Sequence, residues 1–496
     1  MRIRYVAACV ACAATLLAGA PAALAGTQDV PQPGPLDPAF VESLHEPLAG
    51  ILGRRPAPVT VKVGKVARAR LAARAPVLPA QYDLRPLGKL TAVRDQLELG
   101  TCWAFANLAA VESHLLPGTR YDFSEDNLVL RSGYGPFPGG PYQWGGWDFM
   151  AVAYMARWAG PVAETSDKYG DGRSKAAPVL KHLQAAIMLP GRSDVTDNDL
   201  IKQLVIENGA LSVGMYYSPR FDSSVNGEGH PLLPAYYSGK VLDNGDGVDD
   251  AGEVTENHGV VVVGWDDSYP AANFTAYSGQ PPGDGAFLVR NSYGVEYGDA
   301  GYFWASYHDR AFAFGPLTSY SRVDPVTNFA RNYQYDTLGW TQSLGYADGP
   351  TPNEAWGANR FVAKATERIT AVGLYATAAG AQYEVWAGPS LAELSLRAQG
   401  TQALPGFTTV TFTTPLAVSK GRPFVVALRM VTPGTTEPVA VESRFWEGEK
   451  QRWLSHVQGN AGQSYMRNTG DDEWRDLARS GDTAGVNVCL KAYASK

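Results

Sequence analysis

The chain is poor in cysteine. Four of its 496 residues are cysteines, and two of these, Cys9 and Cys12, lie near the start. The other two, Cys102 and Cys489, are far apart in the sequence. Exported proteins that depend on disulfides carry several cysteines at close spacings, so this chain has to be stabilised by its core. Its length allows large cores and predicts two or more domains.

The chain also lacks a strong excess of one charge. Its 42 Lys and Arg residues face 49 Asp and Glu residues, which gives a net charge of −7 and a pI near 5.6. No cluster of Lys and Arg indicates binding to nucleic acid or to an anionic membrane. The sequence therefore predicts no nucleic-acid partner.

Long apolar runs are missing beyond the first residues. Residues 1–25 have a basic start, an apolar stretch and a small-x-small site at Ala23–Ala25, which is the pattern of a signal peptide. The apolar part is too short and too rich in alanine for a good spanning helix, and no later stretch approaches ~20 apolar residues. We expect an exported protein with no membrane span.

Hydrophobic patterning divides the rest of the chain into two regions. Residues 79–322 predict helices at 102–116, 147–159 and 197–208, and strands at 210–217, 259–265, 286–290 and 302–307. Residues 335–496 predict short strands separated by turns, at 369–376, 382–387, 408–413, 424–430 and 486–492. We expect an α+β domain followed by an all-β sandwich that folds as a separate unit.

Cys102 stands at the start of the first predicted helix, six residues after Gln96. The unpaired N–H groups of a helix N-terminus favour a thiolate, the form in which cysteine attacks a carbonyl carbon. A buried structural role is the commonest alternative for a free cysteine.

Two later segments could assist such a thiol. His258 comes directly before an apolar strand, and Asn291 comes directly after another. An imidazole can take the thiol proton and return it to a leaving group, and an amide can hold the imidazole in place. Taken alone, a histidine before an apolar strand is more often structural.

Together these motifs resemble the papain-like cysteine peptidases, peptidase family C1, over about half of the chain. The resemblance rests on Gly100–Ala106, on Asn257–Trp265 and on Asn291–Gly294. It implies a helical lobe and a β-barrel-like lobe with the site between them. It also implies that Cys102 is the nucleophile and His258 the base, that Asn291 orients His258, and that Gln96 donates to the oxyanion.

The same resemblance assigns a substrate-binding role to four further residues. The backbone of Gly145 and Gly146 would pair with an extended substrate, and Trp103 and Tyr293 would flank the site. Tyr293 replaces the tryptophan that usually shields the hydrogen bond between histidine and asparagine, so the shielding is expected to be weaker.

The resemblance implies a secreted bacterial cysteine endopeptidase, working through a thioester acyl-enzyme and requiring no cofactor. Its partner would be a protein or peptide substrate. Two alternatives remain open, which are a catalytically silent papain fold used for binding and a transpeptidase that uses the same thioester chemistry. An intact set of catalytic residues argues against the first.

Residues 26–78 form a separate segment. It begins rich in proline, can form a short amphipathic helix over 39–52, and ends in a basic, alanine-rich stretch. It is either a flexible linker or a propeptide that covers an active-site cleft. Its position directly before the catalytic region favours the propeptide, although it is shorter than is usual for the family.

An acidic run follows at 243–253. Its carboxylates at Asp243, Asp246, Asp249 and Glu253 surround two glycines and could form a calcium loop. The run does not fit an EF-hand, and a solvated acidic turn is the alternative.

Residues 335–496 resemble the lectin-like β-sandwich appended to some prokaryotic papain-like peptidases. The residues that carry this resemblance are Tyr335–Trp340 and Ala355–Asn359. Six tryptophans of the region could stack on sugar rings or fill the sandwich core, at positions 340, 356, 386, 446, 453 and 474. A glycan or cell-wall contact is therefore a hypothesis here, with core packing the alternative for most of these residues.

Overall fold

The computed structural model describes residues 30–43, 53–64, 77–135, 139–219, 235–239, 256–274, 279–349, 351–443, 457–479 and 485–495. The predicted signal peptide, residues 1–25, lies outside this part of the chain. Within it, none of the helices combines the length and apolar character needed to cross a membrane.

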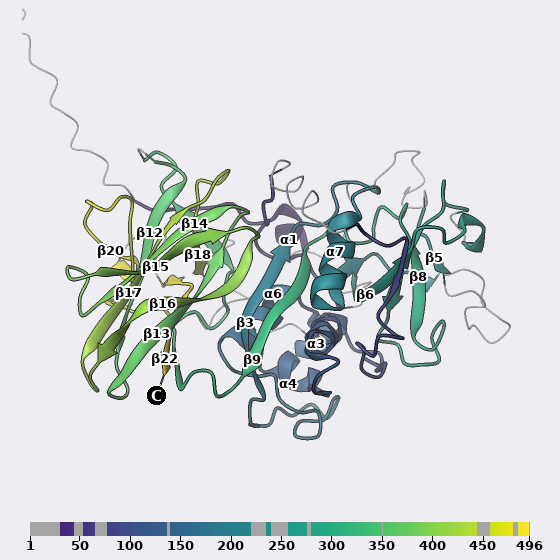
Figure 1. The fold of residues 1–496 in the computed structure, drawn as a ribbon, viewed down its shortest axis with the longest axis horizontal. Helices are drawn as coiled ribbons and strands as arrows, with labels where there is room; N and C mark the ends of the chain where they lie inside the picture. Colours follow the sequence, from purple (N-terminus) through teal and green to yellow (C-terminus); the bar gives the residue numbers. More distant parts are fainter. Residues whose placement is uncertain are drawn as a thin grey trace, which may run out of the picture.

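The first module contains the helices, which lie on the right of Figure 1. The central helix, α3 (Cys102–Leu115), is buried at almost every position, because a face of small side chains, chiefly alanine, lets neighbouring elements approach closely. It ends where Leu116 and Pro117 follow, since proline cannot continue a helix. The other helices are α4 (Glu125–Leu130), α5 (Pro141–Trp144), α6 (Asp148–Ala156), α7 (Asp199–Asn208) and the short η2 (Ala271–Asn273).

The strands of this module form a curved sheet beside α3 (Figure 1). They are β2 (Gln81–Asp83), β3 (Lys181–Leu189), β4 (Leu211–Met215), β5 (Ala235–Tyr236), β6 (His258–Asp266), β7 (Ala286–Arg290), β8 (Tyr302–Ser306) and β9 (Leu317–Pro325). The sequence placed strands only after the helices, whereas β3 lies between α6 and α7. β3 was missed because both of its faces are largely buried, so its apolar residues do not alternate with polar ones.

The second module is an all-β sandwich on the left of Figure 1. Its strands are β10 (Arg331–Tyr333), β11 (Gln342–Gly345), β12 (Glu354–Val362), β13 (Glu367–Ala376), β14 (Ala381–Gly388), β15 (Ser395–Gln402), β16 (Gly406–Val418), β17 (Pro423–Val431), β18 (Val439–Glu442), β19 (Ser464–Arg467), β20 (Arg475–Asp476), β21 (Asn487–Val488) and β22 (Leu490–Ser495), with the short η3 (Leu477–Arg479). A six-stranded sheet, β15-β14-β17-β12-β19-β20, forms one layer. Alternating apolar residues of its strands and of β13 and β22 form the core, as the sequence predicted.

The two modules are joined by a continuous sheet. β16 pairs antiparallel with β3 through Gly406–Thr408 and Ala185–Ile187, and the sheet runs from β10 in the sandwich to β5 in the first module. Gly406 allows this contact, because it has φ 131° and an added Cβ would lie 2.1 Å from the Ala186 carbonyl oxygen. The ring of Trp340 stacks on the ring of Phe149, with centroids 5.7 Å apart, and adds an apolar contact between the two modules.

The segment before residue 65 contacts both modules. β1 (Gln32–Pro33) adds to β11 of the sandwich, and α1 (Pro38–Ser43) follows it. Phe40 of α1 is buried against Trp147, with the two rings 5.5 Å apart. Of the amphipathic helix predicted over 39–52, residues 44–52 lie outside the described part of the chain.

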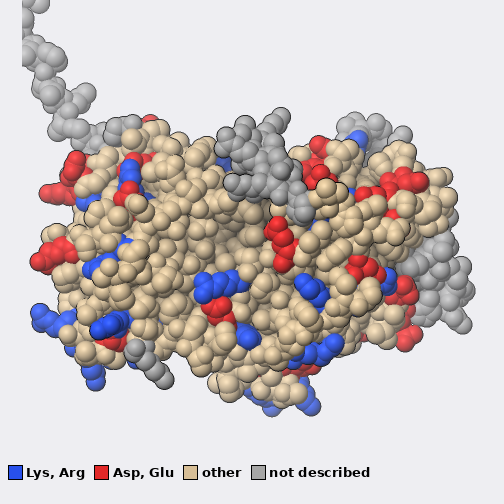
Figure 2. All heavy atoms as spheres, in the orientation of Figure 1, with Lys and Arg blue, Asp and Glu red and all other residues tan. Residues whose placement is uncertain are grey.

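Acidic and basic side chains are interspersed on the face of the molecule shown in Figure 2, consistent with the small net charge.

A chain that ends at residue 334 should be less stable than the full chain. Truncation removes β16 from the edge of β3 and uncovers Phe149, so both backbone pairing and apolar packing are lost. We expect calorimetry to give a Tm lower by at least about 5 °C, because 1 kcal/mol shifts the Tm of a domain of this size by roughly 2–4 °C. An unchanged Tm would mean that the shared sheet contributes nothing to stability.

Candidate active site

Cys102 is the first residue of α3 and is fully buried. Its Sγ accepts a hydrogen bond of 3.1 Å from the backbone N–H of Gly259 in β6. Thr101 does not cap the helix, since its hydroxyl instead lies 2.5 Å from the Tyr169 hydroxyl. The thiol therefore lies where the N-terminus of α3 meets β6.

His258 and Asn291 come together because β6 pairs with β7. His258 begins β6 and Asn291 follows the last residue of β7. The Nε2 of His258 lies 2.7 Å from Oδ1 of Asn291, and both residues are buried. An amide oxygen only accepts, so Nε2 carries the hydrogen and Nδ1 is left as the basic nitrogen.

Tyr293 covers this pair. Its ring stacks on the imidazole of His258, with centroids 4.8 Å apart and planes inclined by 24°. Its hydroxyl lies 3.4 Å from Nδ1 of His258, a long contact. Tyr217 also contacts both rings. Tyr293 thus occupies the predicted position beside the histidine and the asparagine.

Gln96 is held close to the same motif. Its side-chain Nε2 donates to the carbonyl of Leu99 at 2.7 Å, and its Oε1 accepts from the Ser292 hydroxyl at 2.6 Å. Its backbone carbonyl accepts from Tyr169 at 2.9 Å. Ser292 follows Asn291, so the loop that positions the asparagine also positions the glutamine.

Burial sets the charge state of the site. It raises the pKa of the Cys102 thiol to about 12 and lowers the pKa of His258 to about 4. The positive charge of Arg54 acts against the thiol shift and adds to the histidine shift. At neutral pH both groups are uncharged in this closed arrangement.

The N-terminal segment passes directly over these residues. The N–H of Gly146 donates to the carbonyl of Gly53, and the N–H of Arg55 donates to the carbonyl of Gly146, each at 2.9 Å. On the other side, the N–H of Arg54 donates to the carbonyl of Asn257 at 3.1 Å. Residues 53–55 therefore form an extended piece of chain between α5 and β6.

Three glycines make room for this crossing. An added Cβ at Gly53 would lie 2.4 Å from the carbonyl carbon of Gly100, next to the nucleophile. At Gly145 it would lie 2.7 Å from the carbonyl oxygen of Gly53, and at Gly146 it would lie 2.6 Å from the ring of Trp103. Of the predicted substrate-binding residues, Gly145 and Gly146 thus contact the segment directly, and Trp103 lies buried behind Gly146.

Family comparison agrees with this geometry. Residues 78–313 match the family model described as papain family cysteine protease, and residues 332–494 match the model of a lectin-like domain. Residues 78–313 form a papain-family cysteine protease domain. The resemblance inferred from the motifs is confirmed, as is the predicted fold class of a papain-like domain followed by an all-β sandwich.

Solved structures share both modules. The crystal structure of the cysteine protease and lectin-like domains of Cwp84, a surface layer associated protein of Clostridium difficile, matches with a TM-score of 0.75 and 21% identity. The match covers 95% of this chain and 99% of that one. Clostridial Cwp84 after propeptide cleavage matches with a TM-score of 0.69 and 22% identity, over 84% of this chain and 99% of that one. At these identities the likeness concerns the fold.

Two curated relatives match a little under half of the chain. Cathepsin S of Mus musculus is 30% identical over 45% of this chain and 58% of its own length. The viral cathepsin of Cydia pomonella granulosis virus is 28% identical over 46% of this chain and 57% of its own length. The chain therefore spans a little over half the length of each of these relatives.

The sequence did not reveal every residue that shapes the papain-family site. Arg54, Asp148 and Glu256 form a buried ion-pair cluster beside it, with nitrogen–oxygen distances of 2.8 Å to Asp148 and 3.2 Å to Glu256. Glu256 stands two residues before His258, and Asp148 two after Gly146. Their closeness to the motifs could have marked Glu256 and Asp148 as residues of the site. Nothing in the sequence, however, indicated that they pair with an arginine of the preceding segment.

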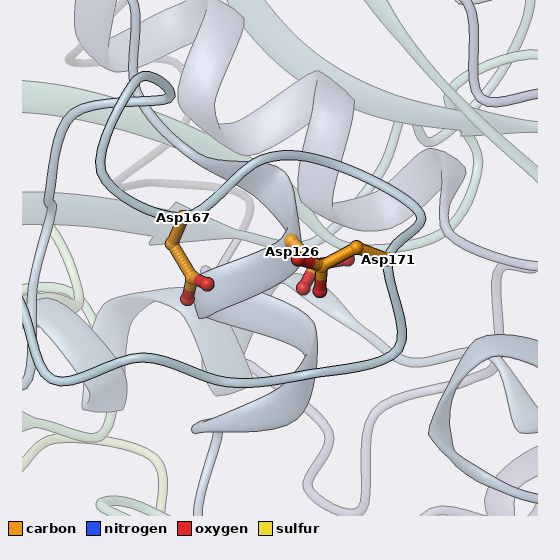
Figure 3. Close-up of side chains that lie close together, drawn as sticks. All are labelled: Asp126, Asp167 and Asp171. Carbon is orange, nitrogen blue, oxygen red and sulfur yellow. The ribbon is translucent and has the colours of Figure 1, made fainter.

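A second acidic group, Asp126, Asp167 and Asp171, lies in the helical lobe of the papain-family domain (Figure 3). Asp126 accepts from the Tyr142 hydroxyl and the Gly170 N–H, while Asp167 accepts from the Lys175 N–H. We assign no metal to this group, because these bonds account for it as an anchor of the loop that carries Tyr169. The predicted calcium loop at 243–253 lies outside the described residues.

Proposed function

We propose that this chain is a secreted cysteine endopeptidase. The observation that carries the proposal is the buried row of Cys102, His258 and Asn291, with Gln96 beside it and a peptide segment lying across it. A protein that merely binds through a papain fold needs no such row.

The proposed reaction uses these groups in sequence. His258 Nδ1 takes the proton of the Cys102 thiol, and the sulfur attacks the substrate carbonyl carbon. The oxyanion that forms accepts hydrogen bonds from the Cys102 backbone N–H and from one N–H of the Gln96 side chain. The other N–H of that side chain donates to the carbonyl of Leu99. His258 then gives its proton to the amine as the C–N bond breaks, and the acyl group remains on Cys102 as a thioester. Water hydrolyses the thioester, with His258 again accepting a proton.

We propose that the segment up to residue 64 is an inhibitory propeptide instead of a linker. It pairs with Gly146 by two backbone hydrogen bonds and places Gly53 over the start of α3. A substrate cannot occupy the same groove. Release of the segment also lets water reach Cys102 and His258, which lowers the cost of the thiolate–imidazolium pair.

One experiment separates this function from its alternatives. The trimmed protein should be labelled at Cys102 by a thiol-reactive epoxide and should hydrolyse peptides. No labelling and no hydrolysis would point to a silent binding protein. A product that joins the acyl fragment to an added amine, in preference to water, would point to transpeptidation.

Replacing Gln96 with alanine should slow hydrolysis by about 10²–10³-fold in kcat, the usual loss on removing one oxyanion donor. The comparison variant is Ser292→Ala, which leaves the Gln96 amide in place but removes the hydroxyl that holds its oxygen. Steady-state kinetics should show a smaller loss for Ser292→Ala. Equal kcat values for Gln96→Ala and the unmodified enzyme would exclude the oxyanion role.

We further propose that the protein is exported and acts at the cell surface. The signal-like residues 1–25 and the likeness to a surface layer associated protein support this. Trp386 and Trp474 are partly exposed and flank Trp356 on the outer sheet of the lectin-like domain, where a sugar ring could stack. Retention of the full chain on glycans or cell-wall material, weakened by Trp386→Ala, tests this contact. Equal retention of the variant would place the contact elsewhere.

A further inference from the structure

Arg54 fills a cavity of the papain-family domain with its whole guanidinium group. Nη1 lies 2.8 Å from Oδ1 of Asp148, Nε lies 3.2 Å from Oε2 of Glu256, and Nη2 donates to the carbonyl of Pro316 at 2.6 Å. Its side chain is only 3% exposed. Three separate acceptors therefore meet one planar cation inside the protein.

The three acceptors that line this cavity belong to the part of the chain that would remain after propeptide release. Asp148 begins α6, Glu256 precedes β6, and Pro316 precedes β9. Two glycines keep the cavity open. An added Cβ at Gly214 would lie 1.7 Å from Oε2 of Glu256, and at Gly315 it would lie 2.3 Å from the same oxygen.

Release of the segment removes the cation that is bonded to both carboxylates of the cavity. Asp148 and Glu256 bring two carboxylates, and Arg54 is the cation that contacts both. Asn107, Ser212 and the Gly315 N–H donate further hydrogen bonds to them, but Oδ2 of Asp148 is buried with no partner among the described residues. A buried charge that loses its partner is costly, so the emptied cavity favours a new cation.

The backbone contacts indicate which position of a substrate would reach this cavity. Gly53 lies against Gly100 and Thr101, the two residues before Cys102, and the next residue, Arg54, pairs with Gly146. A substrate whose carbonyl is attacked by Cys102 takes the place of Gly53. Its leaving part must lie toward His258, which protonates it, so the acyl part lies along Gly146. The substrate therefore runs in the direction opposite to the segment, and its residue before the attacked one takes the place of Arg54.

We propose that Asp148 and Glu256 make this cavity select arginine at the second residue of the substrate before the scissile bond. The inference rests on the proposed peptidase function. Arginine should be preferred over lysine, because a single ammonium cannot meet three acceptors placed around a planar fork.

The test uses the full chain with a recognition site for a sequence-specific protease inserted between residues 64 and 77. The protein is folded, cut, and washed free of the released segment. Matched peptides that differ only at the second position before the scissile bond are then compared by kcat/KM. We expect arginine to exceed leucine by at least tenfold, with lysine between them.

The Glu256→Gln variant keeps the shape of the cavity and the bond to Gly315 but loses one charge. It should reduce the arginine-to-leucine ratio at least fivefold, whereas Glu98→Gln, which removes an exposed carboxylate near the site, should leave the ratio unchanged. A ratio is internal to each enzyme preparation, so partial misfolding does not alter it. Calorimetric binding of the arginine and leucine peptides to the cut Cys102→Ala protein gives the same comparison without catalysis.

Hydrolysis without any preference for arginine at this position would overturn the inference and leave the peptidase function standing. An arginine preference that Glu256→Gln does not change would also overturn it. Failure of the epoxide to label Cys102, together with no cleavage of any peptide, would instead refute the peptidase function on which the inference rests.

Discussion

Peptide hydrolysis should fall to background when Cys102 is replaced by alanine. In the proposed reaction Cys102 supplies the sulfur that forms the thioester, and the oxyanion donors alone cannot replace a nucleophile. Loss of a nucleophile in an enzyme of this kind costs on the order of 10⁴–10⁶ in kcat. Alanine is a good helix former and leaves the buried start of α3 intact, so the Tm should change little.

Cys489→Ala is the matched control. Cys489 is a buried free cysteine of the lectin-like domain, far along the chain from the site. Its replacement by alanine is the same chemical change at a different position and should leave peptide hydrolysis intact. His258→Ala should be nearly as severe as Cys102→Ala, and Asn291→Ala should be milder, because asparagine orients the base without carrying the proton. If the Cys102→Ala variant hydrolysed peptides at nearly the rate of the unmodified enzyme, the assignment of Cys102 as the nucleophile would be wrong.

Replacing Arg54 with alanine in the full chain should activate the enzyme. Removing one partner of a buried ion pair costs roughly 3–5 kcal/mol, which corresponds to about 10²–10⁴-fold weaker docking of the segment. The two backbone bonds at Gly146 remain, so we expect a rise of at least tenfold in hydrolysis of small peptides by the untrimmed chain. Initial rates before and after trimming measure the effect, and trimming should add less to the variant than to the unmodified protein.

Lys62→Ala serves as the control for this substitution. Lys62 is a cation of the same segment, but it is exposed and its backbone contacts the lectin-like domain at Ala378. It should not change the rate of the untrimmed chain. Equal rates for the Arg54→Ala and unmodified chains, with trimming still effective, would show that the backbone contacts alone hold the segment in place.

The sequence predicted the catalytic elements well because each combines a local pattern with a chemical signature. Helix α3 was predicted to within one residue, and β7 was predicted with its observed bounds. Short-range patterns of this kind, such as a proline after a helix or an apolar run before a turn, fix the bounds of an element without help from tertiary contacts. The placement of Cys102 beside Gly259 follows from the family resemblance more than from either pattern.

Long-range pairings were not predictable from local patterns. Arg54 meets Glu256 across 202 residues of sequence, and β16 meets β3 across more than 200. The predicted separate folding of residues 335–496 overlooked this second pairing, since an edge strand in a sandwich and an edge strand in a papain-like lobe look alike in sequence. Both contacts depend on tertiary structure that periodicity cannot encode.

The sheet that passes from β3 into β16 has a mechanical consequence. Hinged modules change their relative orientation through a few flexible residues, whereas the described residues of these two modules are held together by the pairing of β16 with β3 and by the stack of Trp340 on Phe149. The cleft is thus carried at one height and one angle above any surface on which the lectin-like domain rests. For the proposed surface-bound peptidase, the distance of a peptide chain from that surface would then decide, together with its sequence, whether it enters the cleft.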